Sequence, residues 1–176
     1  NAGRSPIKEP GLECLLTKGV SARRLRAVSD GISLVRWADV SLICVGTPSG
    51  ADGSLMLDHV RKVGSDIGTG LLDARKYHTI ALRSTVFPGT TRNILGKILE
   101  EQSGRAIGRD FGIVMNPEFM RETNAVDDFY KPSYTVIGAL DSRSADVIEQ
   151  LYQPLQSTVY RTSLEEAEIL KLCNNA

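Results

Sequence analysis

The stretch DFGIVMNPEFMRE, residues 110–122, joins a short apolar run to a loop that carries two carboxylates, an amide and a guanidinium beside a proline. The apolar half, residues 110–115, predicts a buried strand. In an open α/β sheet, the loops that leave the carboxyl ends of the strands form the ligand crevice. Residues 116–122 are therefore a candidate site, although by themselves they are equally typical of a solvated turn before a helix.

Apolar and β-branched runs predict four further strands, over residues 40–45 (VSLICV), 77–82 (YHTIAL), 134–138 (YTVIG) and 157–160 (STVY). The continuous run 40–45 is typical of a parallel strand that is covered on both faces. Helical periodicity over residues 55–72, from Thr90 onward and over residues 142–151 predicts helices between the strands, with Thr90 as an N-cap. This alternation of strands and helices predicts an α/β fold with a parallel, doubly wound sheet.

The composition excludes several classes of function. The chain of 176 residues carries 21 basic and 21 acidic side chains, so its formal charge is zero and it offers no electrostatic footprint for nucleic acid or an anionic membrane. Cys14, Cys44 and Cys173 are odd in number and widely spaced, which favours reduced thiols over a disulfide framework or a zinc site. The chain has two histidines, and we expect no metal site: His78 reads as a packed strand residue, and His59 as an exposed helix residue.

No apolar run approaches the ~20 residues of a membrane-spanning helix, and no signal peptide opens the chain, so we expect a cytoplasmic protein. The chain begins with Asn1 rather than Met, and the helix predicted from Ser163 has no stop signal before the last residue. We therefore expect the chain to be an excerpt of a longer protein.

Three of the predicted strands end in loops rich in hydroxyls, amides and carboxylates, at residues 46–49, 84–90 and 116–122. Such convergence predicts a ligand crevice. Thr47 and Thr85 each offer a small donor and acceptor to a ribose edge, a carboxamide or an ordered water, or else act only as caps of turns. Glu118 is a candidate general base, because a carboxylate in a partly dry crevice can have a proton affinity useful near neutral pH.

The final predicted helix carries Lys171 and Asn175, which are four residues apart and therefore share a face. Such a pair can hold a developing oxyanion, a role in which loss of one donor typically lowers the rate by a factor of about 10² to 10³. The same spacing more often marks a solvated face. Cys173 lies about 200° around the helix from Lys171, and nothing in the sequence favours it as a nucleophile.

Four segments, in their order and spacing, resemble the UDP-glucose/GDP-mannose dehydrogenase family across nearly the whole chain: CVGTPS at 44–49, RSTVFPGT at 83–90, NPEFMRE at 116–122 and residues 168–175. The combination is much more specific than any one segment. Residues 5–12, Arg83 and the DFG at 110–112 most resemble the GDP-mannose branch of the family. UDP-glucose or another UDP-sugar stays open as the substrate.

The resemblance implies an enzyme that oxidises the primary alcohol of a nucleotide sugar to a carboxylate in two hydride transfers, consuming two NAD and passing through a thioester. It implies a Rossmann-like doubly wound parallel sheet that lacks its first strands. Residues 1–161 would be the C-terminal part of the NAD-binding domain. Residues 162–176 would begin the long central helix through which such enzymes pair as homodimers or higher homo-oligomers.

The resemblance also implies roles for single residues. Thr47 would border the NAD cofactor, and Thr85 would lie between the cofactor and the catalytic water. Glu118 would be the base that helps water to attack the thioester. Lys171 and Asn175 would contact the substrate, stabilise the oxyanion and order the water. Further contacts to the sugar would come from Glu122 and from the backbone of Phe119, Met120 and Arg121.

Three features of the family are missing from the chain: the glycine-rich turn after the first strand, the acidic residue at the end of the second strand, and the motif with the nucleophilic cysteine. Without the first strand, residues 40–45 would have an unpaired apolar edge, so we expect either a larger chain or a partner that fills the gap. A non-catalytic α/β binding or assembly module stays an alternative. A two-domain hydroxyacid dehydrogenase, which also uses a lysine and an asparagine four apart, is disfavoured by the loop at 116–122.

Overall fold

The structure is a computed structural model that describes residues 1–51, 53–155 and 157–175, with side chains described as far as residue 174. The chain forms two compact units. The smaller unit comprises Asn1–Ser29 and Phe119–Ser133, and the larger unit comprises Asp30–Glu118 and Tyr134–Ala176.

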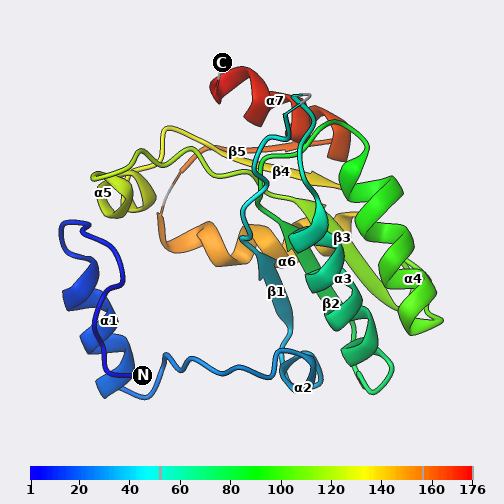
Figure 1. The fold of residues 1–176 in the computed structure, drawn as a ribbon, viewed down its shortest axis with the longest axis horizontal. Coiled ribbons are helices and arrows are strands. Elements are labelled where there is room, and N and C mark those ends of the chain that lie inside the picture. Colours follow the sequence, from blue (N-terminus) through cyan, green and yellow to red (C-terminus); the bar gives the residue numbers. More distant parts are fainter. Residues whose placement is uncertain (52, 156, 176) are drawn as a thin grey trace. The chain divides into compact units, whose positions relative to one another are not determined.

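The larger unit is built on a five-stranded sheet in the spatial order β1-β2-β3-β4-β5 (Figure 1). The strands are β1 (Val40–Ile43), β2 (His78–Leu82), β3 (Phe111–Met115), β4 (Thr135–Ala139) and β5 (Val159–Thr162). All five lie within two residues of the predicted positions. The strands β1, β2 and β3 are parallel, β4 runs antiparallel to β3, and β5 is parallel to β4.

This mixed sheet confirms the Rossmann-like α/β class but differs from the fully parallel sheet that the alternation of elements predicted. Parallel neighbours need a crossover connection that traverses the sheet, whereas antiparallel neighbours need only a return at the same end. Between β3 and β4, the described residues contain only the short helix α5 (Ala125–Tyr130), which belongs to the smaller unit, so no helix of the larger unit connects these two strands. The chain returns to the sheet at the same end at which β3 finishes, and β4 therefore runs antiparallel to β3.

Helices cover both faces of the sheet, as a doubly wound fold requires. The helices of this unit are α2 (Ile32–Val35), α3 (Asp58–Leu71), the π-helix η1 (Thr91–Gly96), α4 (Lys97–Ser103), α6 (Ser142–Tyr152), the 3-10 turn η2 (Gln153–Leu155) and α7 (Leu164–Asn175). On one face, Ala145 and Ile148 of α6 pack in a buried cluster with Val114 of β3. On the other face, Gly96 of η1 lies against Ile113 of the same strand.

The prediction that the first strand is covered on both faces is wrong. Within the described residues, β1 is the edge strand of the sheet and pairs with β2. Leu42, in its middle, is 47% exposed, and Cys44 just after it is also exposed. One edge of β1 therefore has no neighbouring strand among the described residues. This agrees with the expectation that residues 40–45 form an unpaired apolar edge.

His78 of β2 is a packed core histidine, as predicted. It is 1% exposed, and its Nδ1 lies 3.0 Å from the carbonyl oxygen of Ala38 while its Nε2 lies 2.9 Å from Oγ of Ser41. Because a carbonyl oxygen can only accept, Nδ1 carries the proton and the Ser41 hydroxyl donates to Nε2. Burial lowers the pKa of His78. His59, by contrast, is exposed on α3 as expected.

The helix α7 packs closely on β4. A Cβ added at Gly138 would lie 2.4 Å from the carbonyl oxygen of Ser163 and 2.7 Å from Cβ of Ala167. Only glycine allows this approach. The first turns of α7 are thereby fixed to the sheet.

The smaller unit contains α1 (Leu12–Ser21) and α5 (Ala125–Tyr130). The Asn1 side chain donates to the carbonyl oxygen of Ala27 at 2.9 Å and accepts from the backbone N–H of Ala27 at 2.7 Å. The short helix α5 was not predicted. In neither unit does the described part of the chain contain a helix long and apolar enough to cross a membrane.

Candidate functional site

The carboxyl ends of β2 and β3 are held together by the buried side chain of Asn116. Its backbone N–H donates to the Leu82 carbonyl oxygen at 2.9 Å, and its side-chain N–H donates to the Val136 carbonyl oxygen at 2.8 Å. Its Oδ1 accepts from the Arg83 guanidinium and from the Tyr152 hydroxyl, each at 2.5 Å. Arg83 also donates to the Tyr152 oxygen. This network fixes the backbone that leads into Pro117 and Glu118.

The ends of β1 and β2 are joined through the two threonines predicted to border the cofactor. The Thr47 hydroxyl donates to the Thr85 carbonyl oxygen at 2.6 Å, and the Ser84 hydroxyl donates to the Val45 carbonyl oxygen at 2.6 Å. Since the Thr47 hydrogen is used in this bond, its oxygen offers a ligand only an acceptor. At Gly46, an added Cβ would meet no atom within 4 Å. The backbone is open to a ligand at this point.

These features fit one side of a dinucleotide site. An acceptor oxygen beside an open backbone suits a ribose hydroxyl or a carboxamide N–H. The chain offers no glycine-rich turn for the pyrophosphate, so the fit covers only the part of the cofactor that would lie near the ends of β1 and β2.

Glu118 and Lys171 form the other half of the site. The Lys171 ammonium donates to the backbone oxygen of Glu118 and, at 3.0 Å, to its Oε1. The lysine is 5% exposed as a residue, and the Glu118 side chain is 30% exposed. The alternative of a solvated lysine on a surface helix is therefore wrong. The pair places a fixed positive charge beside a carboxylate that solvent or a ligand can reach.

Three residues before Lys171, Glu168 is fully buried and accepts three hydrogen bonds. The donors are the Gly89 N–H, the Thr91 N–H and the Thr91 hydroxyl, each at 2.6 Å. Glu168 thus caps η1, where the sequence predicted Thr90 as the cap. Thr90 occupies the N-cap position, as predicted, but its hydroxyl does not cap the helix, because it donates to the Phe87 carbonyl oxygen at 2.6 Å instead.

Glu168 lies within one of the four family segments, but neither it nor Tyr152 is among the site residues that the sequence predicts. A signal for Glu168 was present, because it occupies a position of α7 at which the helical period predicts a buried residue after Leu164 and Ala167. A carboxylate at such a position needs donors from another element. No comparable local signal marks Tyr152.

The predicted sugar-contacting residues Phe119, Met120, Arg121 and Glu122 belong to the smaller unit, where Arg121 and Glu122 are exposed. The Arg121 guanidinium donates from Nη2 to Oδ1 of Asp128 at 2.7 Å. This hydrogen bond holds the pKa of Asp128 well below its usual range. The roles of these four residues stay predictions.

Asn175 was predicted to act beside Lys171. It is the last residue of α7, and its side chain lies outside the described residues. Its role also stays a prediction.

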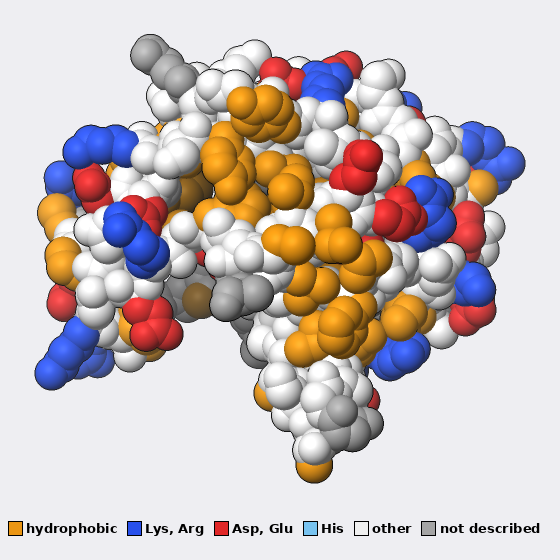
Figure 2. All heavy atoms as spheres, turned by 90° about the horizontal axis from the view of Figure 1, so that it is seen from above, with side chains coloured by type: hydrophobic (Ala, Val, Ile, Leu, Met, Phe, Trp, Pro, Cys, Tyr) orange, Lys and Arg blue, Asp and Glu red, His pale blue; other side chains and the backbone are white. Residues whose placement is uncertain are grey.

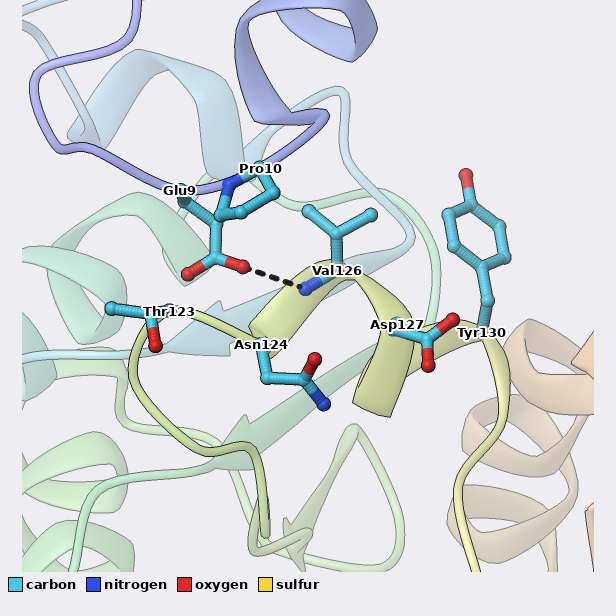
Figure 3. A pocket seen from close by; sticks show the side chains of 7 residues that line it. All are labelled: Glu9, Pro10, Thr123, Asn124, Val126, Asp127 and Tyr130. Carbon is cyan, nitrogen blue, oxygen red and sulfur yellow. Dashed lines mark hydrogen bonds between the residues drawn. The ribbon is translucent and has the colours of Figure 1, made fainter.

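The smaller unit also contains a hollow of about 270 Å³ at the start of α5 (Figure 3). Oε1 of Glu9 accepts from the Val126 N–H there at 3.4 Å. The hollow is lined by Glu9, Pro10, Thr123, Asn124, Val126, Asp127 and Tyr130. None of the predicted site residues is among them.

The cysteines Cys14, Cys44 and Cys173 are exposed and not paired in disulfides. Across the described residues, no three side chains of His, Cys, Asp or Glu gather in a way that could hold a metal ion. The side-chain groups at the strand ends that could take part in a reaction are therefore hydroxyls, carboxylates and an ammonium.

Comparison with known proteins agrees with this geometry. The model of the "UDP-glucose/GDP-mannose dehydrogenase family, NAD binding domain" matches residues 1–156. The chain is 48% identical over 175 residues to a GDP-mannose 6-dehydrogenase of Pseudomonas putida, covering 99% of this chain and 40% of that protein. It is 36% identical over 181 residues to a UDP-glucose 6-dehydrogenase of Haloferax volcanii, covering 100% of this chain and 42% of the relative.

Among solved structures, a ternary complex of GDP-mannose dehydrogenase from Pseudomonas aeruginosa superposes with a TM-score of 0.96 at 43% identity. The match covers 98% of this chain and 40% of that one. This chain thus spans about two fifths of the length of the relatives it matches.

Proposed function

Because this chain belongs to the UDP-glucose/GDP-mannose dehydrogenase family, we propose that it forms part of an NAD-dependent nucleotide-sugar 6-dehydrogenase. The reaction would convert the C6 alcohol of the sugar to a carboxylate through a thioester, with the nucleophilic cysteine outside this chain. The observation that carries the proposal is the contact between Lys171 and Glu118. It brings together two predicted catalytic residues that lie 53 positions apart in the sequence.

NAD, when bound, would accept the hydride that leaves the sugar carbon. In this proposal, the Thr47 oxygen accepts a hydrogen bond from the cofactor. The bond from Thr47 to the Thr85 carbonyl oxygen keeps the ends of β1 and β2 at a fixed separation, so Thr85 holds its place between cofactor and water. The cofactor needs further contacts from a glycine-rich turn that this chain does not supply.

Glu118 and Lys171 would act on the later, hydrolytic step. The Glu118 carboxylate takes a proton from the attacking water, since part of it is accessible to solvent. The Lys171 ammonium stabilises the negative charge that develops on the carbonyl oxygen, because it is held in place and largely shielded from solvent. Asn175 would assist in ordering the water.

GDP-mannose, converted to GDP-mannuronate, is the favoured substrate, and a UDP-sugar is the alternative. The identity of 48% to a GDP-mannose enzyme against 36% to a UDP-glucose enzyme supports this order. Contacts from Glu122 and from the backbone of residues 119–121 would hold the sugar.

The test is to express the complete gene that encodes this chain and to follow NADH formation with GDP-mannose and with UDP-glucose. We expect turnover with GDP-mannose at two NADH per sugar, and a lower kcat/KM with UDP-glucose. A preference for UDP-glucose would correct the substrate. Failure to oxidise any nucleotide sugar would reject the enzyme and leave a non-catalytic binding module.

We further propose that residues 1–161 belong to the NAD-binding domain and that residues 162–176 begin a central helix through which the enzyme forms homodimers or higher homo-oligomers. Ile169 and Leu170 of α7 are 49% and 41% exposed, which supports a partner on that helix. Figure 2 looks from the side on which α7 lies in Figure 1 and shows hydrophobic side chains gathered there. The exposed, unpaired thiols support a reducing compartment such as the cytoplasm.

A further inference from the structure

We propose that Glu168 is a positioning residue: its buried carboxylate fixes α7 to the segment after β2, and this fixed position keeps Lys171 against Glu118. The inference rests on the proposed function for its effect on turnover. Its effect on the position of Lys171 is independent of that function.

The argument begins with the direction of the contacts along α7. Leu164 and Ala167 are fully buried, and the first turns of the helix pack on β4 at Gly138. Beyond this point, the buried positions change from apolar to charged, with Glu168 and Lys171 one turn apart. The helix therefore touches the strand ends through two charged side chains.

These two side chains contact different loops. Glu168 binds the backbone N–H groups of Gly89 and Thr91 in the segment that follows β2, and Lys171 binds Glu118 in the segment that follows β3. Because a rigid helix carries both, the placement of Glu168 determines how far Lys171 reaches toward Glu118.

A carboxylate is expensive to bury, so its presence here requires a physical reason. An ionised group without partners in a dry interior is strongly destabilised. Glu168 has three donors, and two of them are N–H groups at the beginning of a helix, where the positive end of the backbone dipoles favours an anion. An apolar side chain would fill the space, but it could not bind these N–H groups or set the helix at a defined distance from them.

Glu168→Gln separates the hydrogen bonds from the size of the side chain. The amide has nearly the same shape, but one of its two acceptor oxygens becomes an NH2 group, which would face a backbone N–H as donor against donor. The helix must then move away from Gly89 or Thr91. Thr91→Val gives a milder test, since it keeps the shape of Thr91 and removes one of the three donors.

The chain provides a matched control on the same helix. Glu165 of α7 pairs with Arg92 of η1 at 2.7 Å, so it joins the same two elements as Glu168 does. Its side chain is 38% exposed. Glu165→Gln therefore removes the surface contact and retains the buried one.

The experiment uses the complete gene product with each substitution and measures three quantities. The first is the rate at which an acylating reagent modifies Lys171, followed by mass spectrometry. The second is hydrogen exchange of the segment that contains Gly89 and Thr91. The third is the pair kcat and KM for the nucleotide sugar.

With Glu168→Gln, we expect Lys171 to be modified several-fold faster, the segment to exchange faster, and kcat to fall about 10² with little change in KM, as for a catalytic group misplaced by about 1 Å. Thr91→Val should cause the same changes at smaller size, and Glu165→Gln should cause none. Unchanged modification of Lys171 in Glu168→Gln and Thr91→Val would overturn the inference, and so would equal effects of Glu165→Gln. If the unsubstituted protein oxidises no nucleotide sugar but Glu168→Gln exposes Lys171, the positioning role stands and only the proposed function fails.

Discussion

The third strand and the first strand of the sheet have similar apolar sequences but different surroundings. Every residue of β3 is buried, from Phe111 to Met115, whereas Leu42 in the middle of β1 is 47% exposed. The carboxyl end of β3 leads into a network in which Asn116 and Glu118 have partners from other elements. The comparison teaches that apolar runs specify strands, while the position of a strand in the sheet decides whether it is covered.

The largest effect is expected for a substitution of Lys171, the buried residue with a proposed catalytic role. Lys171→Met should lower kcat by a factor of at least about 10² to 10³, because it removes the charge that would stabilise the oxyanion. Steady-state NADH formation by the complete gene product measures this. The matched control is Lys62→Met, which removes an exposed ammonium that pairs with Asp66 on α3. Equal activities of the two variants would contradict the role of Lys171.

Asn116→Ala should cause the next largest effect, a loss of about 3 kcal/mol in the free energy of unfolding. It removes the amide that binds Arg83, Tyr152 and the Val136 carbonyl. Loss of a partner costs a buried group such as this carbonyl about 1 to 3 kcal/mol, and it costs less for the partly buried Arg83 and Tyr152, which still bind each other. Urea denaturation measures the change.

The control for this prediction is Asn124→Ala. It removes a partly buried hydrogen bond from the Asn124 side chain to Asp128 within the smaller unit and should cost about 1 kcal/mol or less. If both variants are equally stable, Asn116 does not hold the strand ends together.

The burial of His78 between β1 and β2 should make the stability of the protein depend on pH. Burial lowers the pKa of His78 below the unfolded value of about 6.5, so the unfolded chain binds more protons in this range and stability falls as the pH drops below about 6.5. The slope contributed by one group is at most about 1.4 kcal/mol per pH unit. His78→Asn should remove this part of the slope in denaturation curves recorded between neutral and acidic pH, whereas His59→Asn should leave it unchanged.

The smallest effect is expected at the open edge, and it sharpens the comparison directly. In a chain of residues 1–176, Leu42→Thr should change the free energy of unfolding by no more than about 0.5 kcal/mol, because half of the side chain already faces water. Val114→Thr in β3 should cost about 2 kcal/mol or more, since it buries a hydroxyl. In the complete gene product, the Leu42 substitution should cost more than in the short chain if another strand covers the edge. Equal costs in both would mean that the edge stays open.

The sequence predicted what depends on local pattern. Apolar runs located all five strands, and helical periodicity located α3, α6 and the helix after Thr90. It missed what depends on distant partners. The direction of β4 depends on whether a helix crosses the sheet after Met115, and the cap of η1 comes from Glu168, 77 residues away from Thr91.

In the candidate site, too, the sequence predicted the residues that lie in recognisable segments and missed a residue that is defined by a contact between distant elements. The residue types at Thr47, Thr85, Glu118 and Lys171 were recognised because they lie in segments of fixed order and spacing, and the structure joins them in two pairs. Tyr152 was missed because it reaches Asn116 from α6, and no spacing in the chain indicates that contact.

Gly138 has no functional group, yet the contact beneath α7 makes it one of the least replaceable positions in the larger unit. A methyl group there would occupy the place of the Ser163 carbonyl oxygen and of the Ala167 side chain, so the helix would have to lift off the strand. Since α7 is rigid, a displacement at its base is carried to its far end. An alanine at this position would thus displace the ammonium of Lys171, which lies about one turn of α7 beyond Ala167.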